Sequence, residues 1–260
     1  MSKASLSSTP VHRTHEGRIA IVTGAARGFG QAFSLGLAAR GATVVGVDLL
    51  DLSKTNQKVT ELGSTFRGFQ IDLTDPEAVL AMAAAVDDEF HQIDILINNA
   101  GIADPETWDE LNFARFSQVL NVNLNSQFLM AKAVTPIMKR NGYGRILNMS
   151  SLTVQMNIDV NIAYRVSKMG VIGLTRALSG SLGNAGITAN AISPAYTPTM
   201  MIAQSGHEGE GEAVAQMQSI KRPATMEDTV PTVMFLTSED AHWVTGQSFN
   251  VDGGLSFNLP

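Results

Sequence analysis

Short apolar runs alternate along the chain with stretches whose apolar residues recur at helical spacing. The run at 19–22 is of the first kind, and Phe29, Phe33 and Leu37 begin a stretch of the second kind. Short apolar runs predict buried strands, whereas a spacing of three to four residues predicts amphipathic helices. The pattern places strands near 18–23, 43–47, 66–71, 94–98, 144–150, 187–193 and 247–251, and helices near 29–40, 54–62, 76–90, 111–140, 162–183 and 226–237.

The alternation predicts an α/β fold, with one doubly wound parallel sheet of about seven strands and helices on both faces. Ligands bind such a sheet at the carboxyl ends of the strands, where the winding reverses. Residues 1–16 have no periodicity and are expected to form a flexible arm before a single domain, 17–260. Within that domain, residues 199–222 are rich in Gly and Glu, which predicts a lid beside the site.

Composition narrows the class of protein. The chain has 260 residues, of which 44% are hydrophobic and 16% charged, and this composition excludes disorder. A net charge of −6 without a Lys/Arg block argues against nucleic-acid binding. No apolar run could span a membrane, no signal peptide is visible, and cysteine is absent. We therefore expect a cytoplasmic protein without a membrane partner.

A glycine-rich turn follows the first predicted strand. The segment Thr23-Gly24-Ala25-Ala26-Arg27-Gly28-Phe29-Gly30 joins that strand to the first predicted helix. Strand, glycine turn and helix in this order are typical of a dinucleotide site, because the backbone can approach a pyrophosphate at the positive end of the helix. The spacing of Gly24, Gly28 and Gly30 differs from the commoner Gly-x-Gly-x2-Gly.

A possible acid–base pair lies far downstream. Tyr164 and Lys168 are four residues apart and share one face of a predicted helix. A cation close to a phenol favours the phenolate, so the pKa of such a tyrosine falls toward neutrality and the side chain can transfer protons. Ser151 stands thirteen residues before Tyr164.

These motifs, taken in order and spacing, resemble the short-chain dehydrogenase/reductase family in its classical form. The resemblance extends over residues 17–254 and is carried by the glycine turn together with Asn98-Asn99-Ala100-Gly101, Asn123, Ser151, Tyr164 and Lys168. It implies a Rossmann-type sheet and hydride transfer between a nicotinamide cofactor and an alcohol or ketone. By resemblance Tyr164 is the acid–base, Ser151 holds the substrate oxygen, Lys168 also binds the ribose, and Asn123 anchors a water that connects Lys168 to solvent.

The expected cofactor is NAD. Asp48 ends the second predicted strand, where a carboxylate accepts the ribose hydroxyls and repels the 2′-phosphate of NADP. Arg27 favours NADP instead, since a basic residue before the second glycine often accompanies NADP in this family. By resemblance the remaining cofactor contacts are Gly24, Gly28, Phe29, Gly30, Leu49, Asp72, Leu73, Asn99, Ala100, Gly101, Pro194, Thr197 and Thr199. Ala195 stands where the family usually has glycine. Because alanine excludes some backbone conformations that glycine allows, the resemblance does not predict the path of this loop around the nicotinamide.

The expected substrate is a small uncharged secondary alcohol, because the acidic lid would repel anions at the entrance. Candidate pocket residues are Ser151, Thr153, Gln155, Met156, Asn157, Tyr196, Met200 and Met201. No metal-ligand spacing is present, so no catalytic metal is expected. Three alternatives stay open, namely a 3-oxoacyl-carrier-protein reductase, a sugar or polyol dehydrogenase, and a nicotinamide-binding regulator without activity. The resemblance also implies a homotetramer.

Overall fold

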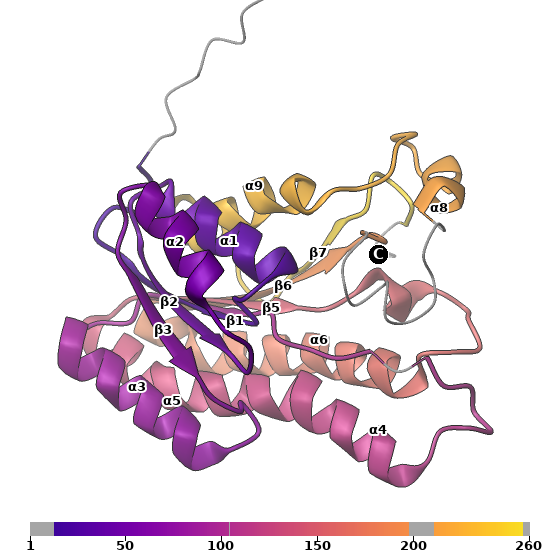
Figure 1. Cartoon of the computed structure of the whole chain (residues 1–260), viewed down its shortest axis with the longest axis horizontal. Coiled ribbons are helices and arrows are strands. Elements are labelled where there is room, and N and C mark those ends of the chain that lie inside the picture. The colour runs from indigo at the N-terminus through magenta and orange to yellow at the C-terminus, as the bar shows by residue number, and fades with distance from the viewer. Residues whose placement is uncertain (1–12, 104, 198–210, 257–260) are drawn as a thin grey trace, which may run out of the picture.

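The computed structural model describes residues 13–103, 105–197 and 211–256, and its centre is one parallel sheet. The seven strands lie in the order β3-β2-β1-β4-β5-β6-β7 (Figure 1). Their bounds are β1 Ile19–Thr23, β2 Thr43–Asp48, β3 Phe66–Gln70, β4 Ile95–Asn98, β5 Gly144–Met149, β6 Ile187–Pro194 and β7 Ser248–Val251. The predicted doubly wound sheet is confirmed, and its winding reverses between β1 and β4.

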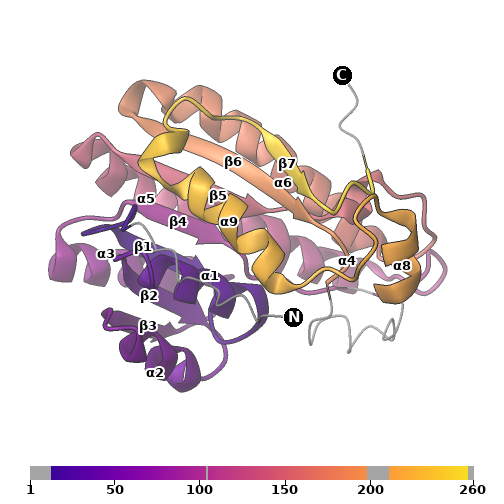
Figure 2. The ribbon, with the colours of Figure 1, turned by 90° about the horizontal axis from the view of Figure 1, so that it is seen from above.

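Helices cover both faces of the sheet, as Figures 1 and 2 show. On one face lie α1 (Gly28–Ala38), α2 (Ser53–Glu61) and α9 (Met226–Thr237). On the other lie α3 (Pro76–Phe90), α4 (Phe113–Leu120), α5 (Ser126–Asn141) and α6 (Ile162–Leu182). Successive residues of β1 enter opposite layers of the core, because neighbouring side chains of a strand point to opposite faces. None of the described helices is both long and apolar enough to cross a membrane.

The helix predicted at 111–140 is in fact two helices. A π-helical turn, Asn121–Asn125, separates α4 from α5. The inserted turn lets Asn123 bury its side chain against the backbone of Ile102, a contact that apolar periodicity cannot reveal. Single π turns inside helices are often found at functional sites. The short helix α8, Gly211–Met217, lies in the predicted lid and was not expected, and residues 198–210 lie outside the described residues.

The predicted arm is partly ordered. Residues 1–12 are not described, but His15 is completely buried and its Nε2 lies 3.0 Å from Thr237 Oγ1 at the end of α9. The flexible arm predicted for 1–16 therefore does not extend to residue 15. One buried imidazole anchors the chain just before β1, which the polar composition of this segment does not show.

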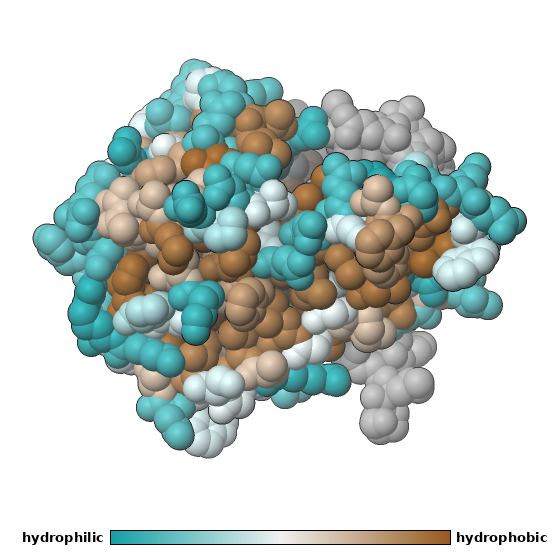
Figure 3. Space-filling model, turned by 90° about the horizontal axis from the view of Figure 1, so that it is seen from below, coloured by the Kyte–Doolittle hydropathy of each residue, from teal (hydrophilic) through white to brown (hydrophobic). Residues whose placement is uncertain are grey.

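One face of the helical layer is apolar where it meets solvent. Phe113 on α4, Phe128 on α5, and Val166 and Met169 on α6 are all exposed large hydrophobic residues. Figure 3 looks onto the side of the molecule that carries these helices and shows a broad hydrophobic area there.

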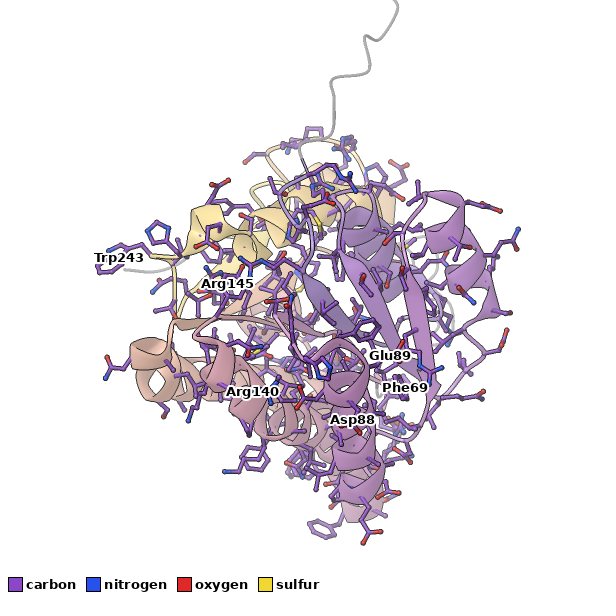
Figure 4. All side chains as sticks on the ribbon, turned by 90° about the vertical axis from the view of Figure 1, so that its left-hand side faces the viewer. Phe69, Asp88, Glu89, Arg140, Arg145 and Trp243 are labelled. Atoms are coloured by element: carbon purple, nitrogen blue, oxygen red, sulfur yellow. The ribbon has the colours of Figure 1, made fainter. Side chains whose placement is uncertain are left out.

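Arg145 is buried at the amino end of β5. Figure 4 labels this arginine on the side of the molecule that faces away from α8. Arg145 Nε donates to Ser238 O at 3.1 Å, and its guanidinium lies 4.2 Å from the ring centre of Tyr143. Arg18 lies over the same ring at 3.7 Å and pairs with Asp94. These cations are satisfied by carbonyls, a ring and a carboxylate, so the cluster is structural rather than an anion site.

Candidate active site

The glycine turn brings backbone close to backbone at the carboxyl end of β1. Gly24 has a φ of +66°, which favours glycine, and a Cβ on Gly30 would lie 2.0 Å from the carbonyl oxygen of Gly24. Gly28 is the first residue of α1, so the positive end of that helix faces the turn. Gly30 does not line the cavity, so its expected contact with a cofactor stays a prediction.

Thr23 and Asn99 join the glycine turn to the end of β4. Asn99 Nδ2 donates to the carbonyl oxygens of Thr23 and Gly24 at 2.9 and 3.3 Å. Thr23 Oγ1 accepts from the backbone N–H groups of Asn99 and Ala100 at 2.9 and 3.0 Å. The amide of Asn99 is therefore committed to the scaffold, although the residue also lines the cavity.

Asp48 is held in place by backbone. One carboxylate oxygen accepts from Ala26 N and the other from Leu50 N, both at 2.9 Å. The side chain thus connects the end of β2 to the glycine turn and still lines the cavity, beside Arg27 and Leu49. A carboxylate oxygen that accepts one hydrogen bond can accept another, so Asp48 stays able to bind a ligand hydroxyl.

Asp72 follows β3 and lines the same cavity. Its Oδ1 accepts from the backbone N–H and the hydroxyl of Thr74, both at 2.8 Å. The N-cap of α3 is Asp75, whose Oδ1 accepts from Glu77 N. Asp72 is therefore not needed as a helix cap, and the next residue, Leu73, is buried.

A cavity of about 700 Å³ runs from this turn across the carboxyl ends of the strands. Most residues predicted for the site lie in its wall, which contains Gly24, Arg27, Gly28, Phe29, Asp48, Leu49, Asp72, Leu73, Asn99, Ala100, Gly101, Ser151, Thr153, Met156, Tyr164, Lys168, Pro194, Tyr196 and Thr197. Thr199, Met200 and Met201 lie outside the described residues. In the described parts of the chain no three His, Asp or Glu side chains come together as a metal site.

Lys168 is buried beside Tyr164. Its ammonium donates to Met149 O at 2.8 Å and lies 5.4 Å from the centre of the Tyr164 ring. Only 3% of Lys168 is exposed, and this burial lowers its pKa to about 8. The helical i,i+4 pairing expected from the sequence therefore places the cation next to the phenol.

Ser151 stands between β5 and a short 3-10 helix, Leu152–Gln155, which it caps. Its Oγ accepts from Thr153 N at 3.2 Å and from Thr153 Oγ1 at 3.0 Å. Two donors occupy the lone pairs of this hydroxyl, so it can still donate its own proton to a further group.

Asn123 is buried behind the cavity wall rather than in it. Its Oδ1 accepts from Ile102 N and its Nδ2 donates to Ile102 O, both at 2.8 Å, with a further bond to Ser167 Oγ at 3.1 Å. A Cβ on Gly101 would lie 3.1 Å from Asn123 Oδ1 and 3.5 Å from Lys168 Nζ. Asn123 and Lys168 thus flank the same glycine.

The substrate side of the cavity differs from the prediction. Gln155 turns away from the cavity and exchanges hydrogen bonds with Asn250, and Asn157 does not line the cavity either. Gln155 ends the 3-10 helix and Asn157 follows it, and both side chains are exposed, which sequence position alone did not indicate. The wall is formed instead by Met156 and by residues that were not predicted, namely Ile158, Asp159, Val160, Asn161, Val214 and Leu255.

Comparison with known proteins places this arrangement in a family. The family described as enoyl-(acyl carrier protein) reductase matches residues 24–256. A 3-oxoacyl-acyl-carrier-protein reductase of Vibrio cholerae is 33% identical over 92% of this chain and 98% of its own. The chain belongs to the short-chain dehydrogenase/reductase family.

Two further members differ in what their names say they act on. D-threitol dehydrogenase of Mycolicibacterium smegmatis is 35% identical over 93% of this chain and 94% of its own. The structure of a carveol dehydrogenase of Mycobacterium avium in complex with NAD superposes with a TM-score of 0.88 at 25% identity, covering 92% of this chain and 98% of that one. The chain is thus an oxidoreductase of this family, whose members differ in substrate.

Proposed function

We propose that this protein oxidises a small uncharged secondary alcohol, or reduces the matching ketone, with NAD as cofactor. The observation that carries the proposal is the shared cavity, which contains the glycine turn at one end and Ser151, Tyr164 and Lys168 at the other. Such an arrangement suits a long cofactor whose reacting end lies beside the acid–base group. A bound nicotinamide accepts the hydride in oxidation and supplies it in reduction.

The cofactor half fits a dinucleotide. A Cβ on Gly24 would lie 2.8 Å from Asn99 Nδ2, and one on Gly30 would lie 2.0 Å from the carbonyl oxygen of Gly24, so the tight turn requires glycine at both positions. The turn leads into the N-terminus of α1, where a pyrophosphate would bind. Asp48 supplies a carboxylate for the ribose hydroxyls, and it would repel a 2′-phosphate. The NAD-bound carveol dehydrogenase supports the choice of NAD. Arg27 in the same wall is the feature that would assist NADP.

Three residues are assigned roles in the transfer of the substrate hydroxyl proton. Tyr164 takes the hydroxyl proton of the alcohol during oxidation and returns it during reduction. Lys168 stabilises the phenolate because its buried ammonium lies over the ring. Asn123, which flanks the same glycine as Lys168, would anchor the water through which the proton reaches solvent.

Ser151 is assigned as a hydrogen-bond donor to the substrate oxygen. Thr153 occupies both lone pairs of its hydroxyl, so the proton of Ser151 is directed away from Thr153. A donor at this position orients the substrate oxygen and stabilises the charge that develops on it.

The described charges of the cavity favour a neutral substrate. Beyond the cofactor half, the charged residues of the described wall are Lys168, which is committed to Met149 O, and Asp159. No further described cation is available there to hold a phosphate, carboxylate or carrier-linked acyl group. The second candidate function is a 3-oxoacyl-carrier-protein reductase, because a relative of this chain carries that name. NADPH-dependent reduction of a substrate linked to acyl-carrier protein would favour this second candidate.

We further propose a cytoplasmic homotetramer. The exposed apolar residues of α4, α5 and α6 form the surface that a second copy would cover (Figure 3). Light scattering after size-exclusion chromatography would measure the assembly.

The experiment that tests the function is a panel of alcohols and ketones, assayed with NAD and with NADP through the absorbance of the reduced cofactor. We expect turnover of neutral secondary alcohols with NAD. Exclusive use of NADP, or exclusive activity on acyl-carrier substrates, would contradict the proposal.

A further inference from the structure

We propose that Asp159 is the residue that selects the substrate, and that its carboxylate binds a second hydroxyl group of a neutral polyhydroxy compound. The inference rests on the proposed function and names the substrate class of the same site. Asp159 belongs to the substrate strap, residues 156–161, which lines the cavity between Ser151 and Tyr164.

The substrate strap is fixed at several points. Arg165 on α6 donates to Ile158 O and to Met156 O, both at 2.6 Å. Val160 forms an antiparallel bridge with Thr107. Asn161 adopts a left-handed conformation with φ of 59° at the N-cap position of α6. Because the backbone is held on both sides of Asp159, its carboxylate is presented from a preorganised position.

The carboxylate of Asp159 is available to a ligand. No group among the described residues donates a hydrogen bond to it or forms an ion pair with it, and the side chain is exposed at the cavity wall. Arg165 is the adjacent cation, but its Nη1 and Nη2 donate to the strap carbonyls. A carboxylate in this setting accepts hydrogen bonds from hydroxyl groups and repels an anionic group at the same position.

Asn161 distinguishes a hydroxyl group from an ammonium group as the ligand of this site. Asn161, two positions after Asp159 in the substrate strap, lines the same cavity, and an amide both donates and accepts hydrogen bonds. A hydroxyl can satisfy both partners, since it donates to the carboxylate and accepts from the amide. An ammonium group can only donate, so it could bond to the carboxylate and to the amide oxygen but not to the amide N–H donors. The pair therefore fits a substrate with hydroxyl groups on neighbouring carbons.

The test uses three alcohols that differ only in the substituent on the carbon next to the carbinol, namely 2-butanol, 2,3-butanediol and 3-amino-2-butanol. The anion 3-hydroxybutanoate, whose carboxylate lies one carbon further, tests the response to negative charge. Each is oxidised with NAD. We expect wild-type kcat/KM for the diol to exceed that for 2-butanol about tenfold or more, as one charge-assisted hydrogen bond allows. Asp159→Ala should abolish this advantage through KM and leave 2-butanol within about twofold.

Asp159→Asn separates charge from hydrogen bonding, because it keeps an acceptor and removes the negative charge. We expect an intermediate KM for the diol and improved oxidation of 3-hydroxybutanoate. The control is Asp109→Asn, which removes an exposed carboxylate outside the cavity wall and should change neither.

Equal wild-type kcat/KM for the diol and 2-butanol would overturn the assignment, as would equal losses for both in Asp159→Ala or a preference for the amino alcohol. If these results came with NAD-dependent oxidation of 2-butanol, the proposed function would stand and the role of Asp159 alone would fail. If the wild-type protein oxidised no neutral alcohol with NAD, the proposed function and the role of Asp159 would both be wrong.

Discussion

His15 gives a stability prediction whose size follows from the structure. The imidazole is completely buried, with Nε2 3.0 Å from Thr237 Oγ1 and Nδ1 3.0 Å from Thr14 Oγ1. Because Thr237 donates its own proton to Val233 O, its oxygen accepts from His15, which fixes the neutral ring with its proton on Nε2.

Protonation of this ring is unfavourable in the folded protein. Burial, followed by the charges of Arg40 and Arg18, lowers the pKa of His15 from 6.5 to about 4. The unfolded chain therefore binds the proton first as the pH falls. The stability present above pH 6.5 is lost progressively down to about pH 4, and the loss amounts to about 3 kcal/mol at about 1.4 kcal/mol per pH unit.

The measurement compares wild type with His15→Gln, which keeps a polar side chain and cannot titrate. Urea unfolding is followed by circular dichroism at one protein concentration, since assembly also contributes to stability. The difference in unfolding free energy, wild type minus variant, should fall by about 3 kcal/mol between pH 8 and pH 4. His242→Gln is the control, because that histidine is exposed. A difference that stays constant across this range, or grows on acidification, would refute the reasoning.

Two substitutions in the cavity wall and one behind the substrate strap test the remaining assignments. Thr153→Val removes the hydroxyl that orients Ser151, so kcat should fall about five- to tenfold with recovery in Thr153→Ser. Equal kcat in the valine variant would show that Thr153 has no such role. Asp48→Arg places a guanidinium where a 2′-phosphate would lie, so calorimetry should record weaker NAD and tighter NADP binding, and an unchanged ratio would oppose the ribose assignment. Arg165→Ala frees the substrate strap and should raise KM for alcohols about tenfold while the Kd of NAD stays constant. Loss of NAD affinity in that variant would point to a general structural role instead.

The strands and the main helices were predictable because their signals are local. Buried parallel strands are short apolar runs, and helices such as α3 carry their own cap at Asp75 and proline at position 76. The glycine turn and the pair Tyr164 and Lys168 were also predictable from the sequence, because each motif has a fixed spacing within a short segment of chain.

The features that the sequence did not predict depend on tertiary contacts. The π turn forms around the buried side chain of Asn123, and the burial of His15 depends on Thr237, more than two hundred positions away. Gln155 is turned from the cavity by a 3-10 helix and by Asn250 in β7. Asp159 carries no local motif, so it became a candidate only when the substrate strap was placed against the cavity.

The central claim is that Tyr164 transfers the proton while the rest of the cavity binds the cofactor. The most direct test measures NADH formation from a neutral secondary alcohol in wild type and in Tyr164→Phe, together with NAD binding by calorimetry. Removing the hydroxyl should lower kcat at least about a hundredfold, which is the size of a general acid–base contribution, while the Kd of NAD should stay within about twofold because the ring remains. A variant that keeps more than a few per cent of wild-type turnover, or that loses NAD binding in parallel with activity, would contradict the account.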